Sequence, residues 1–167
     1  YMDKLDIVTD ESGNEVVLLP EIIFSNKQNI NWNDVEDYLG KYVGELIEIA
    51  ETRDIIYIGN KFPDEYGGSS YTRKTKGARA KAKANAAQGI REMVEIATDK
   101  VYRENHKEKH SEDAHNGWFY YVTRFAIPLY NNEKKTGEYN VYSACLVVNH
   151  AANGKMYLYD VVGIKKE

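Results

Sequence analysis

Three of the four histidines fall within one ten-residue stretch, at positions 106, 110 and 115. His106 and His110 are four residues apart, so they share one face if this segment is helical. Imidazole titrates near neutral pH, which suits general acid–base catalysis. The same spacing could hold a metal ion with Asp113 as a third ligand, or the segment could be a solvated connection. The motif His-Glu-x-x-His is absent, and we expect no metal ion and no cofactor.

Polar side chains also fall inside segments with the composition of β-strands. Alternation over residues 118–129 would place Arg124 in mid-strand, on the face opposite Phe125. An arginine with aromatic neighbours can hold a phosphate bidentately, although it could equally pair with Asp160 or lie on a solvated face. The next strand adds two hydroxyl groups. The candidate catalytic residues are therefore His110, Arg124, Tyr142, Ser143 and His106.

Charge is unevenly distributed along the chain. The whole sequence has 22 Lys+Arg and 26 Asp+Glu, a net charge of −4, yet residues 71–91 hold basic side chains and no acidic ones. On a helix, Lys76, Arg79 and Lys83 would form one stripe between alanines that let a polyanion approach. One hypothesis is contact with nucleic-acid phosphates, and the other is a solvated surface that balances the acidic first third. The candidate nucleic-acid-binding residues are Arg73, Lys74, Lys76, Arg79 and Lys83.

The expected elements place helices before strands. We predict a short strand at 16–24, a helix at 33–50, a strand at 54–59, a loop at 62–71 and a helix at 75–97 that Gly89 could divide. Strands follow at 118–129, 138–150 and 155–164, and Asn153-Gly154 is typical of a tight hairpin turn. This order predicts an α+β fold, with N-terminal helices packed on a C-terminal antiparallel sheet of about four strands.

Length and composition exclude several classes of protein. A chain of 167 residues with 43% hydrophobic side chains suffices for one domain, which we place at 31–167 after an N-terminal arm at 1–30 that holds a short strand. The one cysteine, Cys145, cannot form an internal disulfide. No apolar run approaches the roughly 20 residues of a membrane span, and no secretory signal opens the sequence. We expect a cytoplasmic protein with no membrane partner.

Five segments together resemble a known family. They are residues 54–59 (DIIYIG), 61–66 (KFPDEY), 80–88 (AKAKANAAQ), 117–126 (GWFYYVTRFA) and 157–160 (YLYD), the last followed by Ile164-Lys-Lys. The chain resembles, over about residues 30–167, a domain of large polyvalent proteins and phage head-associated proteins on bacterial mobile elements. That domain is similar to the barnase/EndoU/RelE-like nucleases, whose fold is one or two helices followed by a four-stranded antiparallel sheet.

The resemblance implies a function in RNA chemistry. Members of that superfamily cleave RNA with His, Lys or Arg and with Ser, Thr or Tyr on the sheet face, and this sequence has matching residue types at His110, Arg124 and Tyr142 or Ser143. We therefore expect a metal-independent endoribonuclease-like domain, delivered with phage or conjugative DNA as part of a larger protein. The alternative is a non-catalytic accessory module that binds a protein or nucleic acid. The sequence leaves the oligomeric state open.

Overall fold

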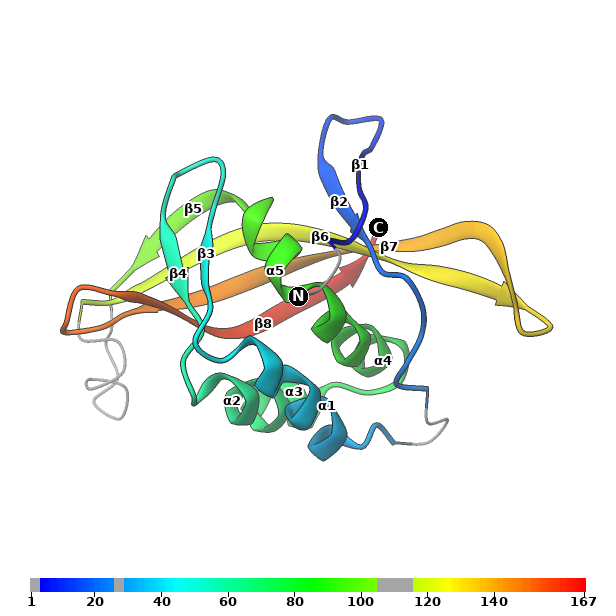
Figure 1. Ribbon diagram of the computed structural model, residues 1–167, viewed down its shortest axis with the longest axis horizontal. Helices are drawn as coiled ribbons and strands as arrows, with labels where there is room; N and C mark the ends of the chain where they lie inside the picture. Colours follow the sequence, from blue (N-terminus) through cyan, green and yellow to red (C-terminus); the bar gives the residue numbers. More distant parts are fainter. Residues whose placement is uncertain (1–3, 26–28, 105–115) are drawn as a thin grey trace.

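The computed structural model describes residues 4–25, 29–104 and 116–167 (Figure 1). One sheet of eight strands dominates it, in the order β1-β2-β6-β7-β8-β4-β3, with β5 pairing β6 beside that path. The strands are β1 (Ile7–Thr9), β2 (Glu15–Leu18), β3 (Leu46–Glu48), β4 (Ile55–Tyr57), β5 (Thr98–Arg103), β6 (Trp118–Asn131), β7 (Lys134–His150) and β8 (Met156–Lys166). The α-helices are α1 (Trp32–Leu39), α2 (Phe62–Gly68), α3 (Ser70–Lys74), α4 (Gly77–Ala86) and α5 (Ile90–Glu95).

The predicted fold class is wrong in its sheet. Strands hold 41% of the described residues and helices 28%, so the sheet is far larger than the four antiparallel strands that we expected. Short strands join its two edges, with β1 and β2 ahead of all the helices and β3 and β4 between α1 and α2. The pairs β2–β6 and β4–β8 are parallel, which makes the sheet mixed. Strands of three or four residues show too little alternation to be recognised in a sequence. The expected N-terminal arm likewise contributes β1 and β2 to this sheet.

The expected C-terminal meander is confirmed. Strands β6, β7 and β8 are adjacent and antiparallel along most of their length. The turn between β7 and β8 contains Asn153 and Gly154, as the sequence predicts. Gly154 has a φ of +85°, which glycine adopts without strain, and the Asn153 side chain accepts a hydrogen bond of 2.9 Å from the Lys155 backbone N–H.

The helices depart from prediction in two places and agree with it in a third. The helix expected at 33–50 ends at Leu39, and a 3₁₀ turn at Gly40–Tyr42 leads into β3. The loop expected at 62–71 contains α2 and α3, because Pro63 lies in the first turn of α2, where proline is favourable, and the Ser69 side chain caps α3. The helix expected at 75–97 divides at a 3₁₀ turn, Ala87–Gly89, where a division at Gly89 was foreseen.

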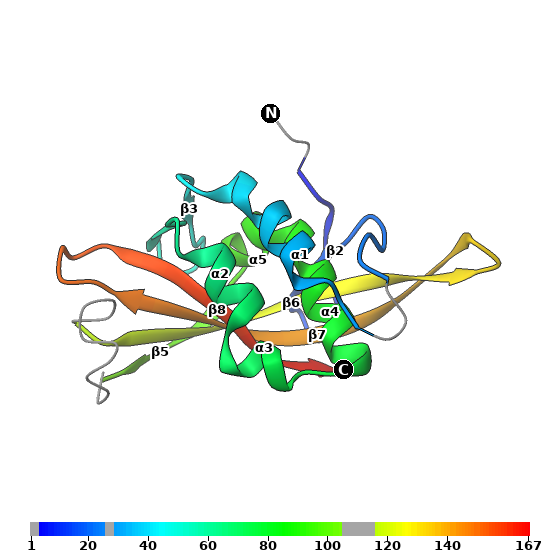
Figure 2. The same cartoon turned by 90° about the horizontal axis from the view of Figure 1, so that it is seen from below.

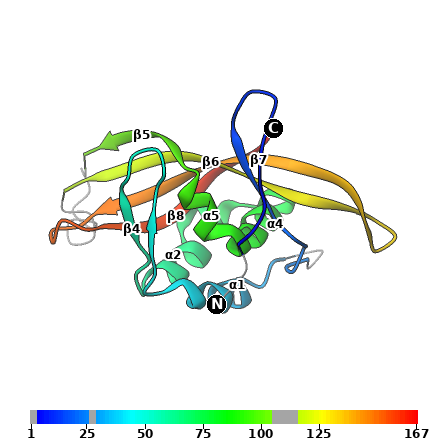
Figure 3. The ribbon, with the colours of Figure 1, turned by 45° about the horizontal axis from the view of Figure 1, so that its top comes forward.

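The main core lies between the sheet and the helices, which lie in front of the sheet in Figure 2. Ala82, Ala84 and Ala86 of α4 are fully buried, and their small side chains let this helix approach β6 and β8 closely. The two short hairpins, β1–β2 and β3–β4, stand on either side of α5 (Figure 3). On the sheet face away from the helices lies a smaller cluster, which we call the aromatic face: Trp118, Tyr120, Val147, Tyr159 and Val162.

Candidate functional site

Three polar residues stand in register across the sheet. Arg124 of β6 pairs with Ser143 of β7, and Ser143 pairs with Lys165 of β8. Their chain neighbours, among them Phe125 and Ile164, belong to the core beneath the helices. Because side chains alternate along a strand, these three point to the opposite face, which also carries the aromatic face. We call this set, with Glu167, the Arg124 row.

Glu167 completes the row by an ion pair. Arg124 Nε donates a hydrogen bond of 2.9 Å to Glu167 Oε1, and the two side chains are 18% and 38% exposed. The Glu167 backbone N–H donates to the Val141 carbonyl at 2.8 Å, which holds the residue beside β7. A guanidinium has five N–H donors, and this contact uses the one on Nε. Cations and a carboxylate therefore share a partly exposed surface, where they can act on a phosphodiester.

A notch in the sheet exposes the Arg124 segment. The edge of β6 pairs with β5 up to Val122 and with β2 from Phe125 onward. Between these partners lies a small cavity of about 100 Å³, lined by Arg124 together with Asn14 and Thr98 among others. The change of partner strand thus opens the sheet edge beside the Arg124 row.

Tyr142 does not join the row, contrary to the sequence-based prediction. Its ring is 5% exposed and stacks on Phe125, with centroids 5.5 Å apart, in the core beneath the helices. Burial raises the pKa of its phenol. Ser143 is one residue further along and therefore faces the other way, so the two hydroxyls that we grouped are separated by the sheet. His106 and His110 lie outside the described residues.

Four of the five predicted basic contacts are exposed, namely Arg73, Lys74, Lys76 and Arg79. Three of them, Lys74, Lys76 and Arg79, line a shallow groove of about 510 Å³, which we call the basic groove. Its residues include Tyr71, whose hydroxyl accepts a hydrogen bond of 2.9 Å from the Ile164 backbone N–H. The basic groove therefore reaches the edge of β8 one residue before Lys165.

Lys83, the fifth predicted contact, is fully buried and cannot reach a phosphate. Its Nζ lies 2.6 Å from Asp160 Oδ1, and also over the rings of Tyr66 and Tyr71, 4.6 and 5.0 Å from their centroids. Burial lowers the pKa of Lys83 and raises the pKa of Asp160, and the attraction between them offsets only part of each shift. Asp160 is thus the partner of Lys83, rather than of Arg124 as one alternative had it.

The sequence pattern misled us about Lys83 for a definite reason. The prediction that Lys76, Arg79 and Lys83 together contact phosphates requires one whole face of the helix to be exposed to solvent. In the structure, α4 begins only at Gly77, and its second half is buried on all sides. The sequence did contain a signal for a buried ion pair. Lys83 lies among alanines and Asp160 lies within a strand, so two opposite charges occur in apolar surroundings.

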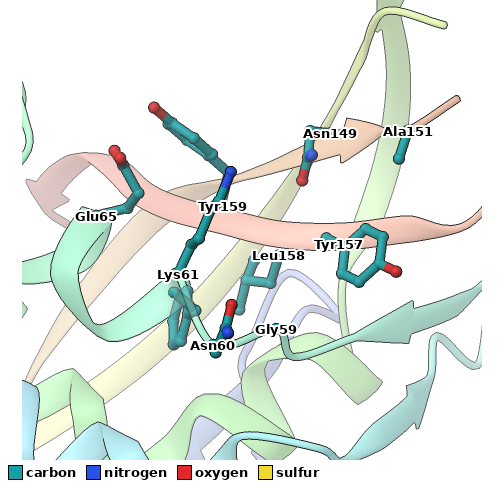
Figure 4. Close-up of a pocket in the computed structure, with 10 residues that line it drawn as sticks. Gly59, Asn60, Lys61, Glu65, Asn149, Ala151, Tyr157, Leu158 and Tyr159 are labelled. Atoms are coloured by element: carbon teal, nitrogen blue, oxygen red, sulfur yellow. The ribbon is translucent and has the colours of Figure 1, made fainter. Parts of the chain in front are cut away.

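A further hollow, which we call the edge pocket, has a volume of about 280 Å³. It lies where the β4–α2 loop and the start of α2 meet β7 and β8 (Figure 4). The buried side chains of Phe62 and Leu158 supply apolar surface, and polar side chains come from α2, β7 and β8. The sequence analysis did not identify this pocket, because its residues come from three separate segments: Gly59, Asn60, Lys61, Phe62, Glu65, Asn149, Ala151, Tyr157, Leu158 and Tyr159.

Within the described part of the chain, no helix is long and apolar enough to cross a membrane, and no three or more His, Cys, Asp or Glu side chains gather as they would around a metal ion. No protein-family model, curated protein or solved structure matches the chain. Function is therefore inferred from the geometry of the Arg124 row, the basic groove and the edge pocket.

Proposed function

We propose that this chain binds single-stranded RNA and cleaves it without a metal ion at the Arg124 row. The observation that carries the proposal is the register of Arg124, Ser143 and Lys165 across three strands, with the Glu167 carboxylate 2.9 Å from Arg124 Nε. Two cations, a hydroxyl and a carboxylate on one sheet face supply charge stabilisation and a base for phosphodiester chemistry.

The reaction is an internal attack on phosphorus. Glu167 removes the proton of an RNA 2′-hydroxyl, and the oxygen attacks the adjacent phosphate while Arg124 and Lys165 stabilise the added negative charge. The bond to the 5′-oxygen breaks, and an acid protonates this leaving group. The sequence predicts that His110 or His106 acts as a general base or acid, and both lie outside the described residues. The products are a 2′,3′-cyclic phosphate and a free 5′-hydroxyl, and deoxyribose cannot react because it lacks the attacking group.

Two surfaces support RNA as the substrate. The aromatic face lies on the same side of the sheet as the row and offers partly exposed rings, such as those of Tyr120 and Tyr159, to unstacked bases. The basic groove approaches the row at Ile164 and attracts the phosphate backbone. In an acidic chain, this local positive charge is what brings a polyanion to the site.

A matched pair of arginine substitutions tests the proposal. Arg124→Gln removes the cation of the row, and Arg53→Gln removes a cation from another exposed Arg–Glu pair, Arg53 with Glu48 at 2.8 Å. We expect Arg124→Gln to lower the rate of RNA cleavage in the presence of a chelator about 100-fold, the usual size of such an electrostatic contribution. Arg53→Gln should cleave like the unaltered chain, and equal losses in both variants would remove the Arg124 row from the reaction.

One observation favours the alternative of a non-catalytic binding module. Glu167 is already paired with Arg124, so the row could simply hold a phosphate while the carboxylate stays neutralised. In that case the unaltered chain binds RNA, the Arg124→Gln variant binds it more weakly, and neither cleaves it. Fluorescence anisotropy and a gel assay on the same samples distinguish the two functions.

The proposed setting is a bacterial mobile element, in keeping with the resemblance to polyvalent and phage head-associated domains. The domain would act in the cytoplasm of a cell that receives phage or conjugative DNA, as part of a larger protein. Quantitative mass spectrometry of purified phage particles or conjugating cells tests this setting, and absence of the chain from both would contradict it.

A further inference from the structure

We infer that the edge pocket binds one base of the RNA and prefers a base with an exocyclic amino group, cytosine over uracil. The inference rests on the proposed function for its ligand class. It starts from the composition of the pocket, which joins apolar surface from Phe62 and Leu158 to ring, amide, ammonium and carboxylate groups within about 280 Å³. A nucleotide has groups complementary to these, because its planar base can stack on rings and its phosphate can bind an ammonium group.

Four polar residues of the pocket match parts of a nucleotide. The rings of Tyr157 and Tyr159 offer faces on which a base can stack. Figure 4 shows the Lys61 chain extending from the start of α2 toward β8, where its ammonium can meet a phosphate. Glu65, on the next turn of α2, is the group that selects. A carboxylate only accepts hydrogen bonds, so it accepts from the cytosine amino group and repels the carbonyl oxygen of uracil.

The edge pocket and the Arg124 row are connected along one face of the sheet. Tyr159 lines the pocket and also packs edge-on against Trp118 of the aromatic face, with ring centroids 5.0 Å apart. Tyr120 and Val162 continue this face toward the row. Ser143 and Asn149 are six residues apart on β7, or about 20 Å in an extended strand. The selected base therefore lies several nucleotides from the phosphate that is cleaved.

A β-bulge places Tyr159 between these two sites. Val147 pairs with Asp160 and Val148 with Leu158, so Tyr159 is the extra residue in β8. Bulges redirect side chains. Because of this bulge, Asp160 points toward Lys83 under the helices, while the adjacent Tyr159 lines the pocket and packs in the aromatic face. The buried ion pair thus fixes the strand at the point where the base would stack.

The test compares two short 2′-O-methyl oligonucleotides, one of cytidine and one of uridine, which lack the free 2′-hydroxyl and cannot be cleaved. Fluorescence anisotropy with the purified chain should give about tenfold tighter binding of the cytidine oligonucleotide, the size of one good base-edge contact. In Glu65→Gln most of this preference disappears, because a carboxamide can also donate to uracil. Glu138→Gln is the matched control, an exposed carboxylate on β7, and keeps the preference.

A third variant checks the stacking surface. Tyr159→Leu should weaken binding of both oligonucleotides about tenfold without changing their ratio, since stacking is tolerant of base identity. Equal affinity of the unaltered chain for the two oligonucleotides, or an unchanged preference in Glu65→Gln, overturns the inference. If RNA cleavage by the Arg124 row persists in that case, the proposed function stands without the pocket. If the chain prefers the cytidine oligonucleotide but cleaves no RNA, the proposed cleavage is wrong and the inference about the edge pocket stands.

Discussion

The buried pair of Lys83 and Asp160 gives a sharp test of how α4 is held on the sheet. The two side chains are 0% and 4% exposed and lie 2.6 Å apart. Removing one partner leaves the other charge buried and uncompensated, which typically costs 3–5 kcal/mol. We therefore expect Lys83→Met and Asp160→Asn each to lower the free energy of unfolding by about 3 kcal/mol near neutral pH. The double variant should lose less than either single one, because no unpaired charge remains.

The two single variants should respond to pH in opposite directions. Without the Lys83 ammonium, the pKa of Asp160 in the folded chain rises further above its ordinary value of 3.8. The folded chain then binds a proton more readily than the unfolded one, so stability falls as pH rises and Lys83→Met costs least in acid. Without the Asp160 carboxylate, burial depresses the pKa of Lys83 further below 10.5. Stability then rises with pH, and Asp160→Asn costs least in alkali.

Urea unfolding followed by circular dichroism measures both effects, at about pH 5, 7 and 9. Lys81→Met is the matched control, since this neighbouring lysine of α4 is only half-buried, and it should change stability by about 0.5 kcal/mol or less. Losses below about 1 kcal/mol in both single variants would refute the reasoning. So would a double variant whose loss equals the sum of the single losses, or pH slopes of the same sign.

Three further predictions concern the basic groove, the half-buried carboxylate of Asp54 and the hairpin turn before β8. Alanine at Lys74, Lys76 and Arg79 should lower the slope of log RNA affinity against log salt by about 2, and an unchanged slope would mean that the groove touches no phosphate. Asp54→Asn should cost about 1 kcal/mol at neutral pH and progressively less as the pH falls below the ordinary pKa of 3.8. Burial raises the pKa of this carboxyl, but hydrogen bonds from a lysine and a tyrosine lower it more, so its stabilisation is lost as pH falls through the folded value. Gly154→Ala should lower stability by about 1 kcal/mol in urea unfolding, since the φ of +85° is strained for alanine.

Long elements could be predicted from the sequence, and short ones could not. Strands β6, β7 and β8 carry 11 to 17 residues each, and an Asn-Gly pair marks the turn before β8. Runs of this length contain enough aromatic and β-branched residues to identify them. β1 and β3 have three residues each, and their place at the sheet edges depends on partners far away in the sequence. This is why the sequence predicted about four strands, whereas the sheet has eight.

Glycines were a second source of error. Gly67 and Gly68 favoured a loop, yet they end α2. Gly67 packs so closely against the side chain of Glu36 on α1 that a Cβ there would force this side chain to shift. A glycine that allows two helices to approach cannot be told from a loop glycine by sequence alone, because the signal lies in a residue 31 positions earlier.

The candidate site was predictable in part. Mid-strand Arg124 and its neighbour in register, Ser143, could be found from alternation along the strands. Lys165 and Glu167 were missed, because their contribution depends on how β8 pairs with β7 and on the extra residues that shift its register. Tyr142 was wrongly grouped with Ser143, although alternation alone places adjacent residues on opposite faces.

The identity of the RNA cleavage product tests the central proposal most directly. The substrate is a DNA oligonucleotide with a single ribocytidine, incubated with the purified chain and a chelator and analysed by mass spectrometry. Internal attack by the 2′-hydroxyl predicts cleavage only after the ribocytidine, with a 2′,3′-cyclic phosphate on one fragment and a 5′-hydroxyl on the other, and little product from Arg124→Gln. A 3′-hydroxyl with a 5′-phosphate, cleavage of the all-deoxy strand, or an intact substrate would contradict it.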